Sequence, residues 1–331
     1  MNGRLEKEIK AKDLMQKKLS ALPAVFTEFY YYLDAEGKSY TTLNNYINHN
    51  IDFMNYVNTN CTPGTFYAGV KASHVNQYMA SIRNKENNGD IVRIGDEIRA
   101  ARWTSINTFF KFLKNNDYVD ENPLDKTNRP KIKTEHKVTY LNKKEMNLVL
   151  KEVKKKASKK KLSRDLCLIS LALSTGLRVS AITQINIEDI NFESNTIKVI
   201  EKGDKTRYIS FGDNLKTLIE NCINDRTQSF SNITTNALFV SQWGTRMTTQ
   251  AVRDLVAKYT SVVVGKHITP HKLRASTAMN LYGAGVDILT IASILGHENV
   301  TTTQRYTQSY DEKKANAAKI LDDSITKATD A

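Results

Sequence analysis

Several short stretches in the second half of the chain carry side chains that can bind an anionic group or form a covalent bond. They are TGLRVS, EKGDK, TPHKLRAS, LGH and TTTQRY, and they supply Arg178, Lys202, His271 with Arg274, His297 and Tyr306. Guanidinium groups stay charged and bind anionic oxygens through several hydrogen bonds, histidine exchanges protons near neutral pH, and tyrosine can form a covalent intermediate. Tyr306 follows His297 by nine positions, behind a run of threonines. Such polar surroundings are unusual for a core tyrosine. The alternatives are a chemical role and a partly buried tyrosine that anchors the C-terminal helix.

The surrounding sequence predicts where these residues lie. Arg178 comes just after a glycine helix stop, Lys202 lies at the tip of a β-hairpin, and His271 and Arg274 share one face of a helix that starts at a proline. Each has an ordinary explanation when taken alone: such an arginine usually forms a salt bridge, such a lysine is usually solvated, and HxxR arises by chance. Their order and spacing along one chain make the set specific.

In this order the motifs resemble those of the tyrosine recombinases, also called the phage integrase family. Members carry an arginine in a TGLR box, a lysine on a β-hairpin, an HxxR box, an LGH box and a nucleophilic tyrosine nine residues after that histidine. The resemblance covers roughly residues 20–310. It implies a site-specific recombinase that cuts and rejoins duplex DNA through a 3′-phosphotyrosyl intermediate, with no metal, no ATP and no cofactor.

The resemblance makes Tyr306 the nucleophile. Its phenol has a pKa near 10, so only about one molecule in a thousand is ionised at pH 7. A base must therefore accept the phenolic proton, and His271 is the candidate.

The other motif residues would act on the phosphate. Negative charge gathers on the non-bridging oxygens in the transition state, and Arg178 and Arg274 are suited to clamp them. As the resemblance implies, Lys202 would protonate the leaving 5′-oxygen, and His297 would hydrogen-bond the scissile phosphate.

Two positions depart from the family pattern. Many members have a carboxylate where this chain has Ala181, and a histidine where it has Ala275. Neither is one of the catalytic positions, so we expect activity to survive. The missing carboxylate bears on the fine positioning of Arg178 or His271.

Hydrophobic periodicity predicts the elements that hold these residues: a mainly α fold with a small β-sheet. Residues 20–117 show a helical pattern throughout, with Thr41 or Thr42 and Ser73 as N-caps. Residues 118–140 carry two prolines and many charges, which is typical of an exposed linker.

The second half alternates helical segments with one β region. An apolar helix ends at Gly176, and a later helix ends at Gly296. Apolar and polar residues alternate over 196–200 and 207–211, and a turn at Gly203-Asp204 joins the two strands.

At 331 residues the chain is long enough for two domains. The resemblance implies a helical N-terminal core-binding (SAM-like) domain and a mixed α/β catalytic domain that together form a C-shaped DNA clamp. The expected divisions are an N-terminal extension (1–19), a helical core-DNA-binding domain (20–120), a linker (121–140), a catalytic domain (141–310) and a C-terminal segment that could dock between protomers (311–331).

The composition favours a nucleic-acid partner. The net charge is +13 and is spread along the chain, and a distributed positive field suits a long polyanion. Candidate phosphate contacts on the outer faces of the N-terminal helices are Lys71, Arg83, Arg99, Arg102, Lys111 and Lys114.

The cysteine spacing and the hydropathy of the chain indicate where the protein is located. The three cysteines are far apart and form no CxxC pair, which argues against a zinc site and fits reduced thiols. No apolar run reaches the roughly 20 residues needed to cross a bilayer. We therefore expect a cytoplasmic protein without a membrane partner.

The implied partner is double-stranded DNA with specific recombination sites. Four protomers would assemble on two sites and exchange strands through a Holliday junction, with accessory DNA-bending or directionality proteins as further candidates. The reaction would integrate and excise a mobile element or invert a DNA segment. The alternatives are a type IB topoisomerase that relaxes DNA as a monomer, a catalytically silent DNA-binding protein on the same scaffold, and an unrelated fold with coincidental motifs.

Overall fold

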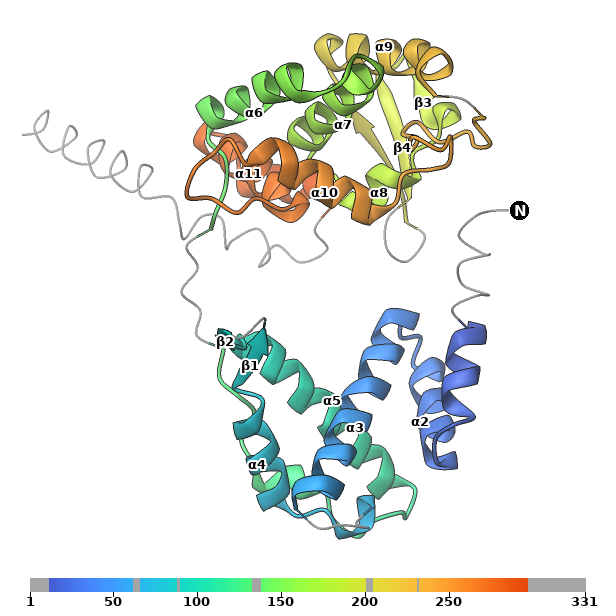
Figure 1. Cartoon of the computed structure of the whole chain (residues 1–331), viewed down its shortest axis with the longest axis vertical. Helices are drawn as coiled ribbons and strands as arrows, with labels where there is room; N and C mark the ends of the chain where they lie inside the picture. The colour runs from blue at the N-terminus through green and yellow to red at the C-terminus, as the bar shows by residue number, and fades with distance from the viewer. Residues whose placement is uncertain are drawn as a thin grey trace, which may run out of the picture. The chain divides into compact units, whose positions relative to one another are not determined.

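The computed structural model describes residues 12–61, 66–87, 90–132, 138–200, 205–230 and 232–296. Within these ranges the chain is mainly helical, with a two-stranded hairpin and a three-stranded sheet (Figure 1). This confirms the predicted fold class. The chain divides into two compact units, Met1–Thr134 and Glu135–Ala331, and each is described by itself.

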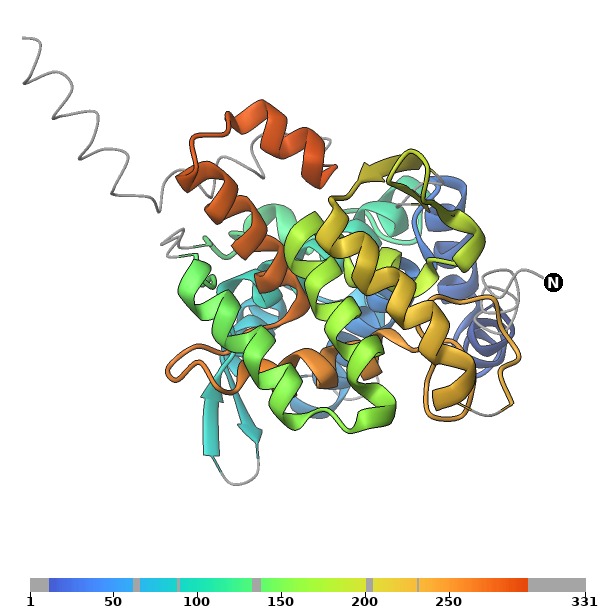
Figure 2. The same cartoon turned by 90° about the horizontal axis from the view of Figure 1, so that it is seen from above.

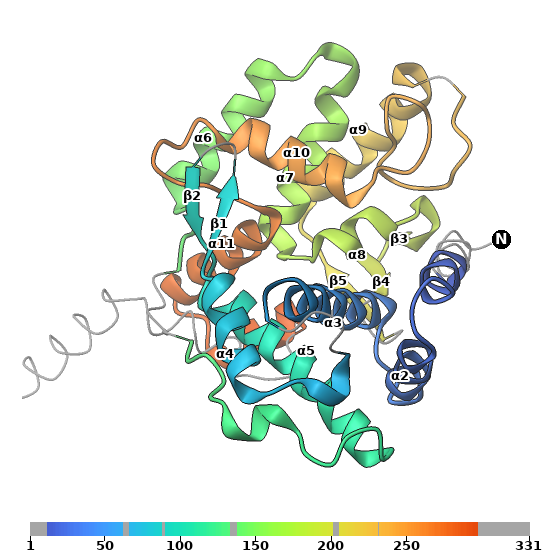
Figure 3. The same ribbon diagram turned by 60° about the horizontal axis from the view of Figure 1, so that its bottom comes forward.

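The first unit is a helical bundle around an aromatic core. Residues 12–19 are helical. The following helices are α2 (Ala24–Ala35), α3 (Tyr40–Asn60), α4 (Ala72–Ser81) and α5 (Asp96–Asn115), with 3-10 turns η1 (Tyr67–Gly69) and η2 (Pro123–Lys126). Helices α3 and α5 lie side by side (Figure 3). The Phe109 ring of α5 lies 5.3 Å from Phe26 and 4.9 Å from Phe29, both on α2. Burial of these rings stabilises the bundle.

Two helix starts differ from the sequence prediction. Helix α3 is capped by Ser39, whose Oγ accepts the Thr42 backbone N–H at 3.4 Å, so neither Thr41 nor Thr42 is the N-cap. Helix α4 begins after Lys71 and not at Ser73. The reason is His74, a buried side chain whose Nδ1 accepts the Lys71 backbone N–H at 3.3 Å and so satisfies the start of the helix.

The prediction of helices throughout residues 20–117 was wrong at one place. Strands β1 (Asn84–Asn87) and β2 (Asp90–Arg93) form an antiparallel hairpin, with Asn84 opposite Arg93. Figure 2 shows the hairpin extending away from the helices of its unit. The sequence of the first strand, NKEN, is entirely polar, so it lacks the apolar–polar alternation that would predict a strand. Pairing of the two backbones defines this hairpin, and single-residue patterns do not report such pairing.

The segment expected to be an exposed linker is partly packed. In η2, Pro123 and Leu124 are buried, and Leu124 belongs to the core of the first unit. The Asn122 Oδ1 caps this turn by accepting the Leu124 N–H at 3.0 Å. Tyr118 donates to the Glu28 carboxylate at 2.7 Å. The first part of residues 118–140 therefore belongs to the helical bundle.

The second unit packs helices against one face of a small antiparallel sheet. The helices are α6 (Lys143–Lys156), α7 (Leu162–Thr175), α8 (Val179–Gln184), α9 (Asp213–Ser229), α10 (Thr249–Thr260), α11 (Pro270–Gly283) and α12 (Ile288–Leu295), with 3-10 turns η3 (Lys159–Lys161) and η4 (Ile187–Asp189). The strands are β3 (Ile190–Asn191), β4 (Thr196–Ile200) and β5 (Thr206–Ser210), in the order β3-β4-β5. Helix α8 contacts both α10 and β4 (Figure 3).

The predicted β-hairpin of the second unit is confirmed in its strands. Ile197 of β4 pairs with Ile209 of β5, and both side chains are buried in the core of this unit. The predicted turn at Gly203-Asp204 lies outside the described residues. Over the described ranges, no helix is both long and apolar enough to cross a membrane.

Candidate active site

The end of α7 places Arg178. Gly176 caps this helix in the left-handed conformation (φ 62°), and its N–H donates to Ala172 O at 3.1 Å. The Thr175 hydroxyl then accepts the Leu177 N–H at 3.3 Å. Arg178 follows as the N-cap of α8, in the extended conformation. The predicted glycine stop and the start of the next helix are confirmed.

Gly176 is also required by its neighbours, which leads to a testable prediction. A Cβ built there would lie 2.6 Å from Leu295 Cδ2 and 3.3 Å from Thr277 Cβ. We expect Gly176→Ala to lower the free energy of unfolding by about 2–4 kcal/mol, because it combines left-handed strain with overpacking. Chemical denaturation measures this change. Gly265→Ala is the matched control, since Gly265 also has a positive φ (79°) but no atom within 4 Å of the added Cβ. An equal loss in both variants would contradict the crowding argument.

Helix α11 carries His271 and Arg274. It begins at Pro270, as predicted, and the Thr269 side chain caps it by accepting the Lys272 N–H at 3.4 Å. Arg274 is only 2% exposed. Its Nη1 donates to Gly176 O at 2.8 Å, and its Nη2 donates to Leu295 O. Arg274 therefore links the ends of α7 and α12.

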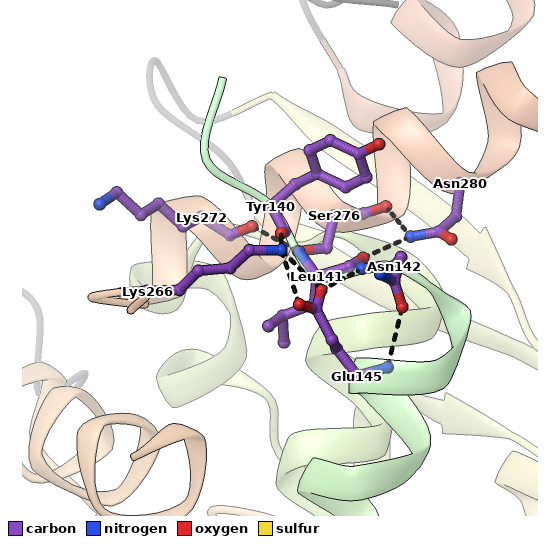
Figure 4. Close-up of polar contacts among 8 residues, drawn as sticks. All are labelled: Tyr140, Leu141, Asn142, Glu145, Lys266, Lys272, Ser276 and Asn280. Atoms are coloured by element: carbon purple, nitrogen blue, oxygen red, sulfur yellow. Dashed lines mark hydrogen bonds and ion pairs between the residues drawn. The ribbon is translucent and has the colours of Figure 1, made fainter. Parts of the chain in front are cut away.

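Polar contacts anchor α11 on the first residues of the unit (Figure 4). Leu141 N donates to Ser276 Oγ at 2.8 Å, and Asn280 Nδ2 donates to Leu141 O at 2.7 Å. Lys266, just before α11, donates from Nζ to Tyr140 O at 2.9 Å and forms an ion pair with Glu145 at 2.7 Å. These contacts fix the helix that presents His271 and Arg274.

Helix α12 ends at the same place. Its C-cap is Gly296, again in the left-handed conformation (φ 66°), as predicted. Arg178 Nη2 donates to Gly296 O at 3.4 Å. Arg178 and Arg274 are far apart in the sequence, yet both guanidinium groups bind neighbouring carbonyls at this helix end.

His271 lies beside these positive charges. Partial burial of its imidazole, and then the charges of Arg274 and Arg178, lower the pKa of His271. His271 is nonetheless an exposed residue, so its ring can be reached from solvent. A lowered pKa keeps the ring neutral at pH 7, which is the state that can accept a proton.

The two departures from the family pattern lie in packed surroundings. Ala181 is 4% exposed in the main core of the second unit, and Ala275 is 6% exposed in a smaller cluster with Met279, Ile291 and Leu295. Both small side chains are core residues here. Three predicted site residues, Lys202, His297 and Tyr306, lie outside the described residues.

The predicted DNA contacts of the first unit fall into two groups. Lys71, Arg83, Lys111 and Lys114 are exposed. The other two, Arg99 and Arg102, do not extend freely from an outer face as predicted.

Arg99 and Arg102 are engaged within the helical bundle. Arg99 pairs with Asp96 at 3.1 Å, and Arg102 pairs with Asp52 at 3.1 Å and donates to Tyr78 Oη at 2.7 Å. Asp96 lies on α5 itself, one helical turn before Arg99, whereas the partners of Arg102 come from α3 and α4.

One residue at this site escaped the sequence analysis. Arg207 of β5 donates to Ser293 O at 3.2 Å and to Ile294 O at 2.8 Å, both near the end of α12. The sequence does contain a sign of this role. Arg207 is two positions before the buried Ile209, so in a strand the two side chains lie on the same, apolar face of the sheet.

The chain matches the profile of the phage integrase family over residues 139–313. It is 30% identical over 218 residues to tyrosine recombinase XerC of Pediococcus pentosaceus, which covers 65% of this chain and 72% of that protein. It is 36% identical over 146 residues to tyrosine recombinase XerD of Staphylococcus haemolyticus, which covers 44% of this chain and 50% of that protein.

Solved structures agree on the fold. The crystal structure of the XerH site-specific recombinase bound to a palindromic difH substrate, a post-cleavage complex, superposes with a TM-score of 0.64. The match covers 86% of this chain and 80% of that one, at 19% sequence identity. At this level of sequence identity, the structural similarity shows only that the two chains share a fold.

Proposed function

The chain belongs to the phage integrase family, and from this membership we propose that it is a site-specific DNA recombinase that joins Tyr306 covalently to DNA. The proposed active-site residues are Arg178, Lys202, His271, Arg274, His297 and Tyr306. The recombination activity follows from the family and its curated relatives, and the residue assignments are our own.

One observation carries the assignment of the site. Arg178 and Arg274 meet at the end of α12, where they bind Gly296 O and Leu295 O. Two guanidinium groups anchored on adjacent carbonyls are suited to clamp one phosphate. The next residue along the chain is His297, and Tyr306 follows nine positions later.

The proposed cleavage step is a transfer of the phosphoryl group to tyrosine. The Tyr306 oxygen attacks the scissile phosphorus and loses its proton to His271, while the bond from phosphorus to the 5′-oxygen breaks. The leaving oxygen takes a proton from Lys202, and the 3′ end remains esterified to Tyr306. Resealing is the reverse step, in which a 5′-hydroxyl of a partner strand attacks the phosphotyrosine.

The arginines supply most of the stabilisation in this scheme. Charge on the non-bridging oxygens rises toward the transition state, and removing one preorganised donor from such a site typically costs about 10²–10³ in rate. Arg274 is preorganised because its hydrogen bonds to Gly176 O and Leu295 O hold the guanidinium in place. His271 is neutral and ready to accept a proton, for the reason given above.

The partner is double-stranded DNA carrying specific recombination sites. Four protomers act on two sites, and we propose that both units contact the duplex, the first through exposed side chains such as Lys71, Arg83, Lys111 and Lys114. We place this activity in the cytoplasm. Neither relaxation by a monomeric topoisomerase nor silent DNA binding has a supporting observation of its own.

A nicked suicide substrate tests the proposal. The duplex is built on the site that the chain selects from a randomised DNA pool, and the wild-type protein should form an adduct that resists denaturant. No adduct on any selected duplex would overturn the proposed function.

The role of Lys202 has its own prediction. Lys202→Ala should slow cleavage by about 10²–10⁴-fold when the leaving group is a normal 5′-oxygen, because a general acid typically contributes that much. A 5′-bridging sulfur leaves without a proton, so it should restore most of the rate. Single-turnover cleavage of both substrates measures this, with Lys205→Ala as a nearby lysine control. Equal slowing on oxygen and sulfur would remove Lys202 from the acid role.

A further inference from the structure

Arg207 is a charged side chain at a strand position that normally holds an apolar one. It shares a face of β5 with Ile209, which is buried in the core. Arg207 itself is half-buried, and its guanidinium group donates to Ser293 O and Ile294 O. A half-buried cation needs such partners, so its hydrogen bonds determine where the side chain points.

The acceptors of Arg207 are the last carbonyls of α12. Most carbonyls in the final turn of a helix have no intrahelical donor, and positive charge is favourable there. Ser293 O also accepts the Gly296 N–H at 3.0 Å. Arg274 binds Leu295 O and Arg178 binds Gly296 O in the same turn. Three arginines from β5, α11 and the start of α8 therefore cover the carbonyls of residues 293–296.

Arg207 joins two segments that lead into the proposed chemistry. In the β4–β5 register Arg207 lies opposite Val199, and the loop between the strands contains Lys202. At the other end of the link, α12 packs on α11 through Ile291 and Leu295 and leads directly to His297. The hydrogen bonds of Arg207 run from the strand after Lys202 to the helix before His297.

We propose that Arg207 is a positioning residue that holds the Lys202 hairpin in register with the end of α12. The inference rests on the proposed function, because it takes Lys202 as the general acid. A misplacement of about 1 Å in a catalytic group can cost roughly 100-fold in rate. Ile197, Val199 and Ile209 hold the strands in the core, and the Arg207 link adds a polar attachment between β5 and the end of α12.

The first test compares leaving groups. Arg207→Ala should slow cleavage of the 5′-oxygen substrate by about 10–100-fold, and the 5′-bridging sulfur should return most of that loss, as for Lys202→Ala. Affinity for the selected duplex should stay within about twofold of wild type. Arg207→Lys should be intermediate, since lysine keeps the charge and loses the planar fork.

The matched control is Lys198→Ala. Lys198 lies on β4 opposite Tyr208, and its side chain is exposed on the other face of the same sheet. It removes the same charge from the same hairpin, so a general electrostatic effect would affect both variants equally. The proposal requires Lys198→Ala to cleave both substrates at close to the wild-type rates.

A second measurement does not depend on the chemistry. Amide hydrogen exchange of the full chain should become faster in β5 and in the last turn of α12 in Arg207→Ala, but not in Lys198→Ala. Unchanged exchange would overturn the proposal whatever the cleavage rates are.

The remaining outcomes separate the two hypotheses. If sulfur rescues Lys202→Ala but not Arg207→Ala, the positioning role is wrong and the acid role stands. A large loss of DNA affinity in Arg207→Ala would identify a phosphate contact and would also overturn positioning. If sulfur fails to rescue Lys202→Ala, the acid role fails, and with it the stated purpose of the Arg207 link.

Discussion

Replacing Tyr306 with phenylalanine is expected to abolish the covalent protein–DNA adduct and leave DNA affinity within about twofold of wild type. Only the phenolic oxygen distinguishes the two side chains, and that oxygen forms the bond to phosphorus in the proposed step. Loss of a catalytic nucleophile typically costs about 10⁴–10⁶ in rate, which would put cleavage below detection.

The measurement is adduct formation on the nicked duplex, with binding followed separately by electrophoretic mobility. Tyr310→Phe is a close control, since Tyr310 lies four positions further along the same segment. It should form the adduct normally. If Tyr306→Phe still forms the adduct and Tyr310→Phe does not, the nucleophile is Tyr310 and the proposed assignment is wrong.

Arg274 gives the second large effect. Arg274→Lys should slow cleavage by about 10²–10³-fold, because lysine keeps the charge but cannot reproduce the planar fork. Arg274→Ala should abolish detectable cleavage and also lower stability. It leaves Gly176 O and Leu295 O without their donor in a buried place, and each unsatisfied buried group costs about 1–3 kcal/mol.

Two readouts separate these contributions. Thermal denaturation reports the stability loss, and single-turnover cleavage below the melting range reports the catalytic loss. Arg253→Ala serves as a control, since Arg253 is an exposed arginine of α10 in the same unit that donates to Gln250. Wild-type cleavage rates in a folded Arg274→Lys would show that the guanidinium geometry is not used in the transition state.

Part of the site could be predicted from the sequence because it depends on local chemistry. Gly176 and Gly296 end helices, since glycine tolerates a positive φ, and Pro270 starts one, since its fixed φ suits the first turn. These markers act within a few residues. They place Arg178, His271 and Arg274 correctly on their elements.

Other features could not be predicted, because they depend on contacts between segments that are distant in the sequence. The β1–β2 hairpin has a polar first strand, and the engagement of Arg102 depends on Asp52 of α3 and Tyr78 of α4. The burial of Leu124 likewise depends on a core assembled from distant helices. Composition and periodicity do not encode such contacts.

By itself, the sequence determined the types of the proposed reacting groups, their order along the chain and the helix ends near Arg178, His271 and Arg274, because those properties are covalent or local. Only the tertiary structure decided that Arg178, Arg207 and Arg274 meet at residues 293–296. The carbonyls at the C-terminal end of a helix attract positive charge. They become a common anchor only after α7, β5, α11 and α12 have packed together.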